Sequence, residues 1–239
     1  MPNSRGFVVK SIKNGETSMI VSCYLEDIGL KSFMVKGVYG TKKPKFSKAY
    51  FFPLNFISIN YTLSKDDRLS YIKEVKPINF YKSLHSSIEK STVIVFLSEV
   101  LNSVFKEEGD KNQNLFNFLD KSLNWFDAQE ICSNFHIKFL IELTKHIGFY
   151  PNITSEDDKF FNIESGSSST IKPLSKFIDF DDYKLFKQLL GMKFEDLNYM
   201  SIDKDSRIRL LNYIIDYYSL HLQMFKSPKS IDVFCEIFK

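Results

Sequence analysis

Five lysines lie within a stretch of sixteen residues that contains no acidic residue. The stretch VKGVYGTKKPKFSKAY covers residues 35–50, and three aromatic residues are interleaved with the lysines. Lysines bind the phosphates of a nucleic acid, and aromatic rings offer surfaces on which its bases stack. The pattern therefore indicates sequence-tolerant binding of single strands. The alternative is that the rings belong to a hydrophobic core and the lysines only solvate a long loop.

Candidate catalytic groups are sparse in this chain. All four histidines fall in segments that we predict to be helical (His85, His136, His146, His221). Three acids of DFDDY, Asp179, Asp181 and Asp182, could hold a divalent metal, but acids just before a helix more often cap its free N–H groups. No phosphate-binding loop, nucleophile elbow or HExxH pair is present. We therefore expect no enzymatic activity, no metal site and no cofactor.

The cysteines and the apolar runs of the chain indicate its cellular compartment. Cys23, Cys132 and Cys235 lie far apart and include no CxxC pair, which argues against a zinc ribbon or a disulfide framework. The first ten residues lack the apolar core of a signal peptide, and no apolar run approaches the length of a membrane span. We expect a cytoplasmic protein that does not contact a membrane.

Charge is distributed unevenly along the chain. Residues 1–79 hold thirteen Lys or Arg and six Asp or Glu, so this part carries a formal charge of +7. The remaining residues hold nineteen basic and twenty-three acidic side chains, a formal charge of −4. A composition that is merely rich in lysine would not leave the second part acidic. The asymmetry favours a first part that faces a polyanion.

Two kinds of periodicity divide the chain near Pro77. Before it lie five short β runs separated by turn residues; in FISINYTL, for example, Ile57, Ile59 and Tyr61 alternate with polar residues. After it the apolar spacing becomes helical: Ile88 and Val95 belong to one predicted apolar stripe, and the last long helix is predicted to run from about Arg207 to Phe225. One segment, 154–172, is weakly patterned around the strand-like FFNI. We predict an α+β protein: a basic five-stranded OB-fold barrel over residues 1–79, which binds nucleic acid, and an α-helical domain over 80–239.

Several longer stretches of the chain resemble the RecO family of bacterial recombination mediators and DNA-repair proteins. The first is GFVVKSIKNGETSMIVSCYLEDIGLKSFMVKGVYG, with a turn at Gly15, Glu16 and Ser18 and VKG before the basic loop. The others are FLSEVLNSVFKEEGDKNQNLFNFLDKSL, then IELTKHIGFYP followed by FFNIESG, and finally YSLHLQMFKSPKSIDVF. The likeness covers nearly the whole chain. Its motifs are weak one by one, and their order and spacing carry it.

The chain departs from that pattern in its central insertion. Some family members carry four zinc-binding cysteines there, but residues 152–175 of this chain contain no cysteine. A zinc site is therefore not carried over. The insertion must be held by packing, for example of Phe160, Phe161 and Ile163, or be mobile.

The resemblance implies a function in DNA repair and recombination. Family members bind single- and double-stranded DNA, anneal complementary strands, and engage RecR and the acidic, apolar C-terminal tail of single-strand-binding protein. Together these partners load RecA onto covered DNA in the bacterial cytoplasm, associated with the nucleoid. Annealing needs no catalytic residue, only a basic surface that screens the repulsion between two strands.

We assign two groups of cations to these tasks. The predicted DNA-binding residues are Arg5, Lys10, Lys31, Lys36, Lys42, Lys43, Lys45 and Lys48. The candidates for the tail of single-strand-binding protein are Lys138, Lys145, Arg207 and Arg209. The main alternative is an RNA-binding OB-fold factor of translation or ribosome assembly, which predicts a preference for structured RNA and no effect on annealing.

Overall fold

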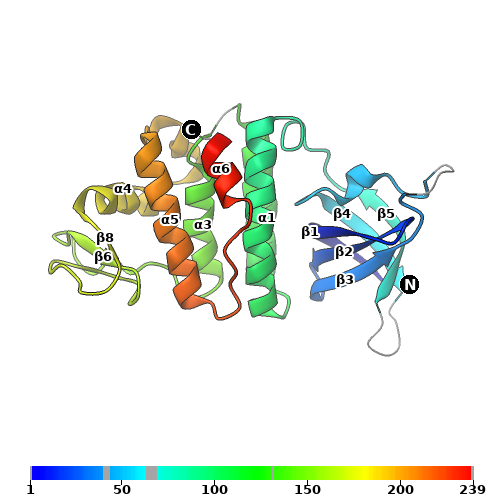
Figure 1. The fold of residues 1–239 in the computed structure, drawn as a ribbon, viewed down its shortest axis with the longest axis horizontal. Coiled ribbons are helices and arrows are strands. Elements are labelled where there is room, and N and C mark those ends of the chain that lie inside the picture. The colour runs from blue at the N-terminus through cyan, green and yellow to red at the C-terminus, as the bar shows by residue number, and fades with distance from the viewer. Residues whose placement is uncertain (1, 40–43, 63–68, 131, 238–239) are drawn as a thin grey trace. The chain divides into compact units, whose positions relative to one another are not determined.

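The computed structural model describes residues 2–39, 44–62, 69–130 and 132–237. Its internal contacts divide the chain into two compact units, residues 1–116 and 117–239. The first unit holds a β-barrel and one long helix, and the second is mostly helical (Figure 1). The change from strands to helices falls after Pro77, whereas the division between the units falls within helix α2.

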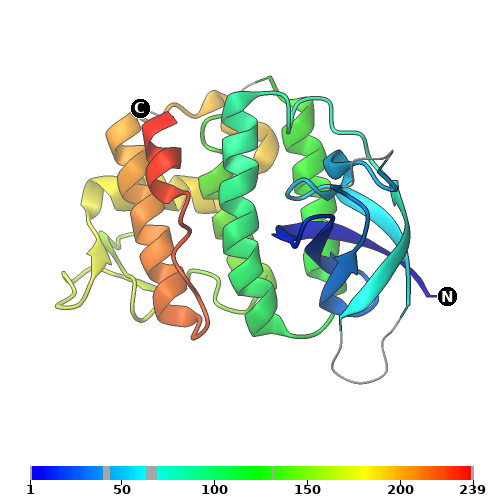
Figure 2. The same ribbon diagram turned by 45° about the vertical axis from the view of Figure 1, so that its right-hand side comes forward.

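The first unit contains a closed barrel (Figure 2). Its strand order is β1-β2-β3-β5-β4. Its strands are β1 (Asn3–Asn14), β2 (Ser18–Leu25), β3 (Gly29–Val35), β4 (Phe56–Thr62) and β5 (Ser70–Pro77). The short 3-10 helix η1 (Lys48–Phe51) lies between β3 and β4. Four of the five neighbouring pairs are antiparallel, and the β3–β5 pair is parallel. The OB-type barrel predicted from the sequence is confirmed.

The alternation of apolar residues explains the barrel core. In β4, Ile57, Ile59 and Tyr61 are buried while Ser58 and Asn60 are half-exposed, as predicted. Strands β2 and β3 follow the same rule, so that Val21, Cys23, Phe33 and Val35 fill the interior. Because successive side chains of a strand point to opposite faces, each strand presents one row inward and one row outward. Burial raises the pKa of the Cys23 thiol to about 12, as expected for a packing residue.

Helices α1 (Ile88–Glu108) and the start of α2 (Gln113–Ala128) cover one end of the barrel's outer surface. The ring of Tyr24 stacks on Phe105 with 3.9 Å between centroids, and Phe116 packs against Phe7 at 5.1 Å. The Tyr24 hydroxyl also accepts a hydrogen bond from the Asn112 N–H at 3.0 Å. Gly29 has φ +71°, and a Cβ there would lie 2.9 Å from the carbonyl carbon of Asp110. Only glycine therefore permits this close approach of the β2–β3 turn to the α1–α2 loop.

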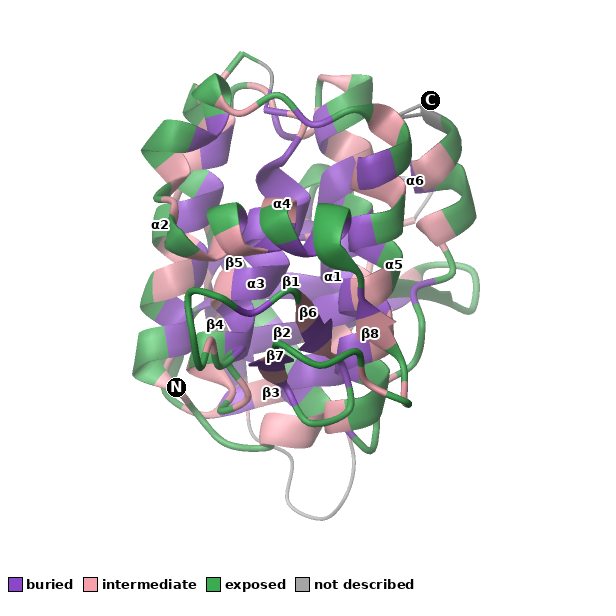
Figure 3. Ribbon diagram, turned by 90° about the vertical axis from the view of Figure 1, so that its left-hand side faces the viewer, coloured by how far each residue is buried: buried purple, intermediate pink, exposed green. Residues whose placement is uncertain are grey.

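The second unit packs around the buried helix α3 (Phe135–His146). Its other helical elements are the part of α2 from Asn117 on, α4 (Phe180–Gly191), the 3-10 helix η2 (Phe194–Tyr199), α5 (Lys204–His221) and α6 (Ile231–Ile237). α3 and α5 run side by side (Figure 1), and the Tyr218 hydroxyl donates to the Leu140 carbonyl at 2.8 Å. Most of α3 is buried, whereas α4 keeps an exposed side (Figure 3). None of the helices in the described ranges combines the length and apolar character that a membrane span needs.

The central insertion forms a small sheet. Its strands β6 (Phe160–Asn162), β7 (Ser167–Ser169) and β8 (Phe177–Ile178) pair in the order β7-β6-β8. Phe161 and Ile163 are buried, and Phe161 packs on Phe186 of α4 at 5.0 Å. The strand expected at FFNI is confirmed over Phe160–Asn162, and packing is the one of the two expected alternatives that the structure shows.

Several local predictions were wrong. Helix α1 begins at Ile88, where Ser87 caps it, so His85 lies in the preceding turn rather than in a helix; its Nε2 lies 2.8 Å from Asn55 Oδ1. Ile88 and Val95, assigned to the apolar stripe of this helix, are exposed. The last long helix ends at His221 rather than Phe225. In each case the apolar spacing was correctly read as helical, but capping and packing determine where the helix begins and which side is buried.

Candidate nucleic-acid interface

Most of the predicted DNA-binding lysines lie on the barrel surface. Lys10 is exposed on β1, Lys31 on β3, and Lys36 just after β3. Lys45 precedes η1 and Lys48 begins it, and both are exposed. Lys42 and Lys43 lie outside the described residues. Among the described residues, none of the five placed lysines forms an ion pair.

The lysines of this region lie over aromatic rings. Lys48 Nζ lies 4.3 Å from the centroid of the Tyr39 ring, and Lys13 approaches the same ring at 5.5 Å. Lys45 lies 4.9 Å from the Phe46 centroid. A cation over a ring face is attracted by the ring's quadrupole, which holds the side chain without neutralising its charge. The arrangement therefore presents oriented positive charges that can bind phosphates.

The burial of the three aromatic rings in the basic stretch shows whether they are available to stack on bases or belong to the core. Phe46 belongs to the barrel core, and Tyr39 and Tyr50 pack against that core. Phe51 is also buried, whereas Phe52 is 46% exposed. The three interleaved rings therefore serve the packing of the barrel. Sequence reasoning missed Tyr71, an exposed ring on β5 whose centroid lies 4.9 Å from Lys36 Nζ; the only signal was its alternation with the buried Ile72.

Arg5 differs from the lysines. Its guanidinium donates two hydrogen bonds to Glu26, at 2.7 and 2.8 Å, and also approaches the Phe56 ring at 5.9 Å. The bonds from Arg5 lower the pKa of the Glu26 carboxyl. A guanidinium held by both oxygens of a carboxylate has less charge to offer a phosphate than a lysine without an ion pair.

The four cations predicted for a protein partner are placed very differently. Lys138 is only 1% exposed, and its Nζ bonds to Glu142 at 2.6 Å and to the Leu189 carbonyl at 2.9 Å. Arg209 is paired with both oxygens of Asp182, which raises the pKa of the arginine. Lys145 is exposed near the end of α3 and lies over the Tyr150 ring at 5.8 Å. Lys138 and Arg209 thus have structural partners within the second unit.

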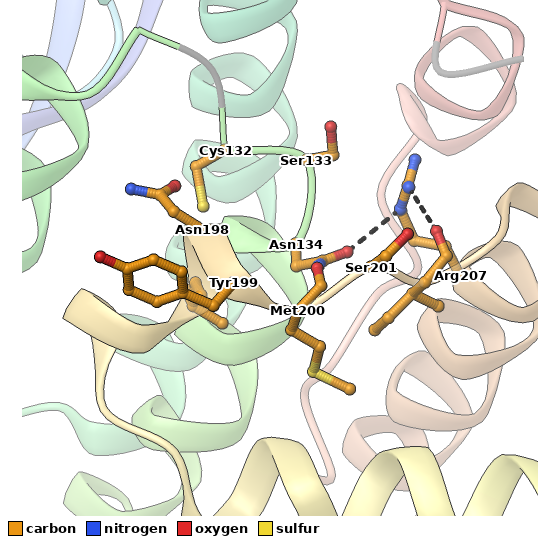
Figure 4. Close-up of a pocket in the computed structure, with 10 residues that line it drawn as sticks. Cys132, Ser133, Asn134, Asn198, Tyr199, Met200, Ser201 and Arg207 are labelled. Atoms are coloured by element: carbon orange, nitrogen blue, oxygen red, sulfur yellow. Dashed lines mark hydrogen bonds between the residues drawn. The ribbon is translucent and has the colours of Figure 1, made fainter.

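Arg207 lines a cavity of about 390 Å³ between η2 and the segment before α3 (Figure 4). The guanidinium donates to Asn134 Oδ1 at 3.3 Å and to the Ile202 carbonyl at 2.8 Å. Apolar side chains of Leu197, Met200 and Ile202 share the lining. Burial lowers the pKa of Arg207, but an arginine keeps its charge at neutral pH. The cavity therefore places a cation beside a few apolar side chains in a lining that is otherwise mostly polar.

The other candidate groups have structural roles. Asp179 caps helix α4 by accepting from the Asp182 N–H, as expected from DFDDY. His136, His146 and His221 lie in α3 and α5, as predicted. Among the described residues, no group of three His, Cys, Asp or Glu could hold a metal ion.

In comparisons with known proteins, the two parts of the chain match the N-terminal and C-terminal models of one protein family. The family model described as Recombination protein O N terminal matches residues 1–81, and that described as Recombination protein O C terminal matches residues 85–230. The chain belongs to the RecO family. Similar proteins named DNA repair protein RecO include those of Flavobacterium psychrophilum and Flavobacterium johnsoniae, each 37% identical with 98% of both chains covered. That of Bacteroides fragilis is 32% identical, with 98% of this chain and 97% of the relative covered.

Membership of the RecO family agrees with the observed barrel and helical region. It places the chain in a family of DNA repair and recombination proteins. The resemblance read from the sequence is confirmed.

Proposed function

We propose that the protein is a recombination mediator that binds single- and double-stranded DNA through the lysines of its barrel and anneals complementary strands. The observation that carries the proposal is the set of exposed barrel lysines that form no ion pair within the described residues (Lys10, Lys31, Lys36, Lys45 and Lys48). The name of the relatives, DNA repair protein RecO, supports DNA as the polyanion.

Annealing follows from the chemistry of these lysines. Two strands repel each other through their phosphates, and mobile point charges screen this repulsion without fixing base edges. The proposal needs no catalytic group. With RecR and RecA, such a surface would exchange single-strand-binding protein for recombinase on covered DNA.

We further propose that the cavity beside Arg207 receives the C-terminal tail of single-strand-binding protein. An acidic tail with an apolar end requires a cation next to apolar side chains, and Arg207 with Leu197, Met200 and Ile202 offers both. Arg207→Gln should weaken binding of a peptide with the host protein's tail sequence at least tenfold in a fluorescence anisotropy titration. Lys184→Gln, at an exposed lysine of the second unit outside the cavity, is the control. Equal affinities of the two variants would place the tail elsewhere.

The test of the proposed function is an annealing assay with two complementary labelled oligonucleotides. The barrel triple variant (Lys36→Gln, Lys45→Gln, Lys48→Gln) should anneal them several-fold more slowly than the wild type. The control triple variant (Lys121→Gln, Lys184→Gln, Lys229→Gln) removes the same charge from exposed lysines of the second unit and should keep the wild-type rate.

Coating the strands with the host single-strand-binding protein completes this test. The wild type should still anneal coated strands, and should fail when the coat protein lacks its tail. Binding of DNA without annealing of bare strands would exclude the mediator function, and a preference for structured RNA would favour the translation or ribosome-assembly alternative.

A further inference from the structure

One row of apolar side chains crosses four strands of the barrel on its outer surface. Ile12 of β1 lies opposite Ile20 of β2, Ile20 lies opposite Met34 of β3, and Met34 lies opposite Tyr71 of β5. Directly opposite residues of paired strands point to the same face of a sheet. Their neighbours Met19, Val35 and Ile72 fill the interior, so the row points outward. We call Ile12, Ile20, Met34 and Tyr71 the outer row.

The outer row is open to solvent. Ile12 is 49% exposed and Tyr71 is 38% exposed, while Ile20 and Met34 are half-buried. Single exposed apolar residues are ordinary on a protein surface, but four neighbours in one row form a contiguous patch. Helices α1 and α2 cover the parallel row that contains Phe7 and Tyr24, at the other end of the same face. Among the residues of the first unit that the structure describes, no helix covers the outer row in this way.

The rows beside the outer row are polar, and their only charges are positive. On one side Lys10, Ser22 and Ser32 face one another. On the other side Asn14 lies opposite Ser18, and Lys36 directly follows the end of β3. None of the ten positions of the three rows is acidic. Lys36 Nζ lies over the Tyr71 ring at 4.9 Å. An apolar strip between cations complements a ligand that is both apolar and anionic.

We propose that the outer row is a stacking platform for the unpaired bases of a single strand. The Tyr71 ring provides the stacking surface, Ile12, Ile20 and Met34 extend it, and Lys10 and Lys36 meet the phosphates on either side. Stacking on an aromatic ring tolerates any base, because every base has a flat face. A duplex keeps its bases stacked inside and can use only the lysines. The inference rests on the proposed DNA binding and adds that the protein binds bases as well as phosphates.

The test compares two labelled strands of equal length, a thymine oligonucleotide and an abasic oligonucleotide with the same phosphates. The wild type should bind the thymine strand more tightly in an anisotropy titration. Tyr71→Ala should weaken binding of the thymine strand by about 5- to 100-fold, the range for loss of stacking by one base. It should leave binding of the abasic strand unchanged within about twofold.

Matched variants separate stacking from other roles of Tyr71. Tyr71→Phe keeps the ring and should retain wild-type affinity. Ile12→Thr keeps a β-branched residue in the strand, so it tests the apolar surface with little risk to the fold, and should weaken only the thymine strand. Lys36→Gln should weaken both strands alike.

The outcomes distinguish this inference from the proposed function. If Tyr71→Ala weakens both strands equally, or neither, the platform is excluded while DNA binding through lysines stands. If the wild type binds neither strand, the proposed function fails, and the inference fails with it. If an acidic, apolar peptide competes with both strands and its affinity depends on Tyr71, the outer row binds protein instead.

Discussion

Lys48 and Lys138 show how the surroundings of a lysine decide its use. Lys48 is exposed, lies over the Tyr39 ring and forms no ion pair with a described residue. Lys138 is buried, and its ammonium is bonded to Glu142 and to backbone carbonyls of α4. The first can exchange counterions for phosphates, whereas the second is committed to joining α3 to α4. Sequence alone gave both the same charge.

Lys138→Met should therefore destabilise the protein without changing DNA affinity. The substitution leaves the Leu189 carbonyl without its ammonium donor and Glu142 without its cation, and a hydrogen bond to a charged group contributes about 1.5–3 kcal/mol. Urea unfolding should show a loss of that size in the free energy of unfolding. Lys145→Met, an exposed change on the same helix, should alter it by less than about 0.5 kcal/mol. A similar loss in both variants would contradict the structural role.

His136 makes stability depend on pH. Burial lowers its pKa to about 3, and its ring packs edge-on against Phe234. The unfolded chain gains a proton near pH 6.5, while the folded chain does not until about pH 3. The contribution is thus complete above pH 6.5 and is lost as the pH falls, by at most about 1.4 kcal/mol per pH unit.

The measurement is urea unfolding of the wild type and His136→Leu at pH 7 and pH 5. The wild type should lose more stability than the variant between these two values. If both lose the same amount, protonation of His136 does not contribute.

At the scale of elements, a short polar network closes the small sheet. Asp158 is buried and accepts from Thr154 Oγ1 at 2.7 Å, from the Ser155 N–H at 2.9 Å and from Ser168 of β7. These bonds, the Ser168 bond first, lower the pKa of the Asp158 carboxyl. The network joins the start of the insertion to β7, in the segment that lacks zinc-binding cysteines.

Asp158→Ala should loosen this sheet. We expect faster amide hydrogen exchange over residues 152–178 and little change over the barrel, because the lost bonds are local. Asp157→Ala changes the exposed neighbouring acid and is the matched control. Unchanged exchange in Asp158→Ala would show that Phe161 and Ile163 hold the sheet without the network.

The elements also show what sequence can and cannot predict. The five strands and the Asp179 cap follow from local patterns, because alternation and capping depend on neighbours in the chain. The outer row does not, because register between strands brings Ile12, Ile20, Met34 and Tyr71 together. The burial of the Lys138 ammonium depends on its hydrogen bond to a backbone carbonyl fifty-one residues away. Sites built from distant partners therefore required the structure.

At the scale of the whole molecule, the structure shows which elements carry the excess of positive charge in the sequence. Residues 1–79, with a formal charge of +7, form the barrel, and the acidic remainder is mostly helical. A basic barrel attracts a polyanion by releasing the counterions that the polyanion had condensed. Cations of the second unit such as Lys138 and Arg209 instead pair with acids of that unit. The account thus assigns DNA binding to the barrel.

The most direct test is the salt dependence of DNA affinity. The logarithm of the affinity falls linearly with that of the salt concentration, with a slope of about 0.7 per contacted phosphate for single strands. The barrel triple variant should reduce the slope by about 2, and the control triple variant should leave it unchanged. Equal slopes for the wild type and both variants would show that the barrel lysines are only solvated, and would contradict the account.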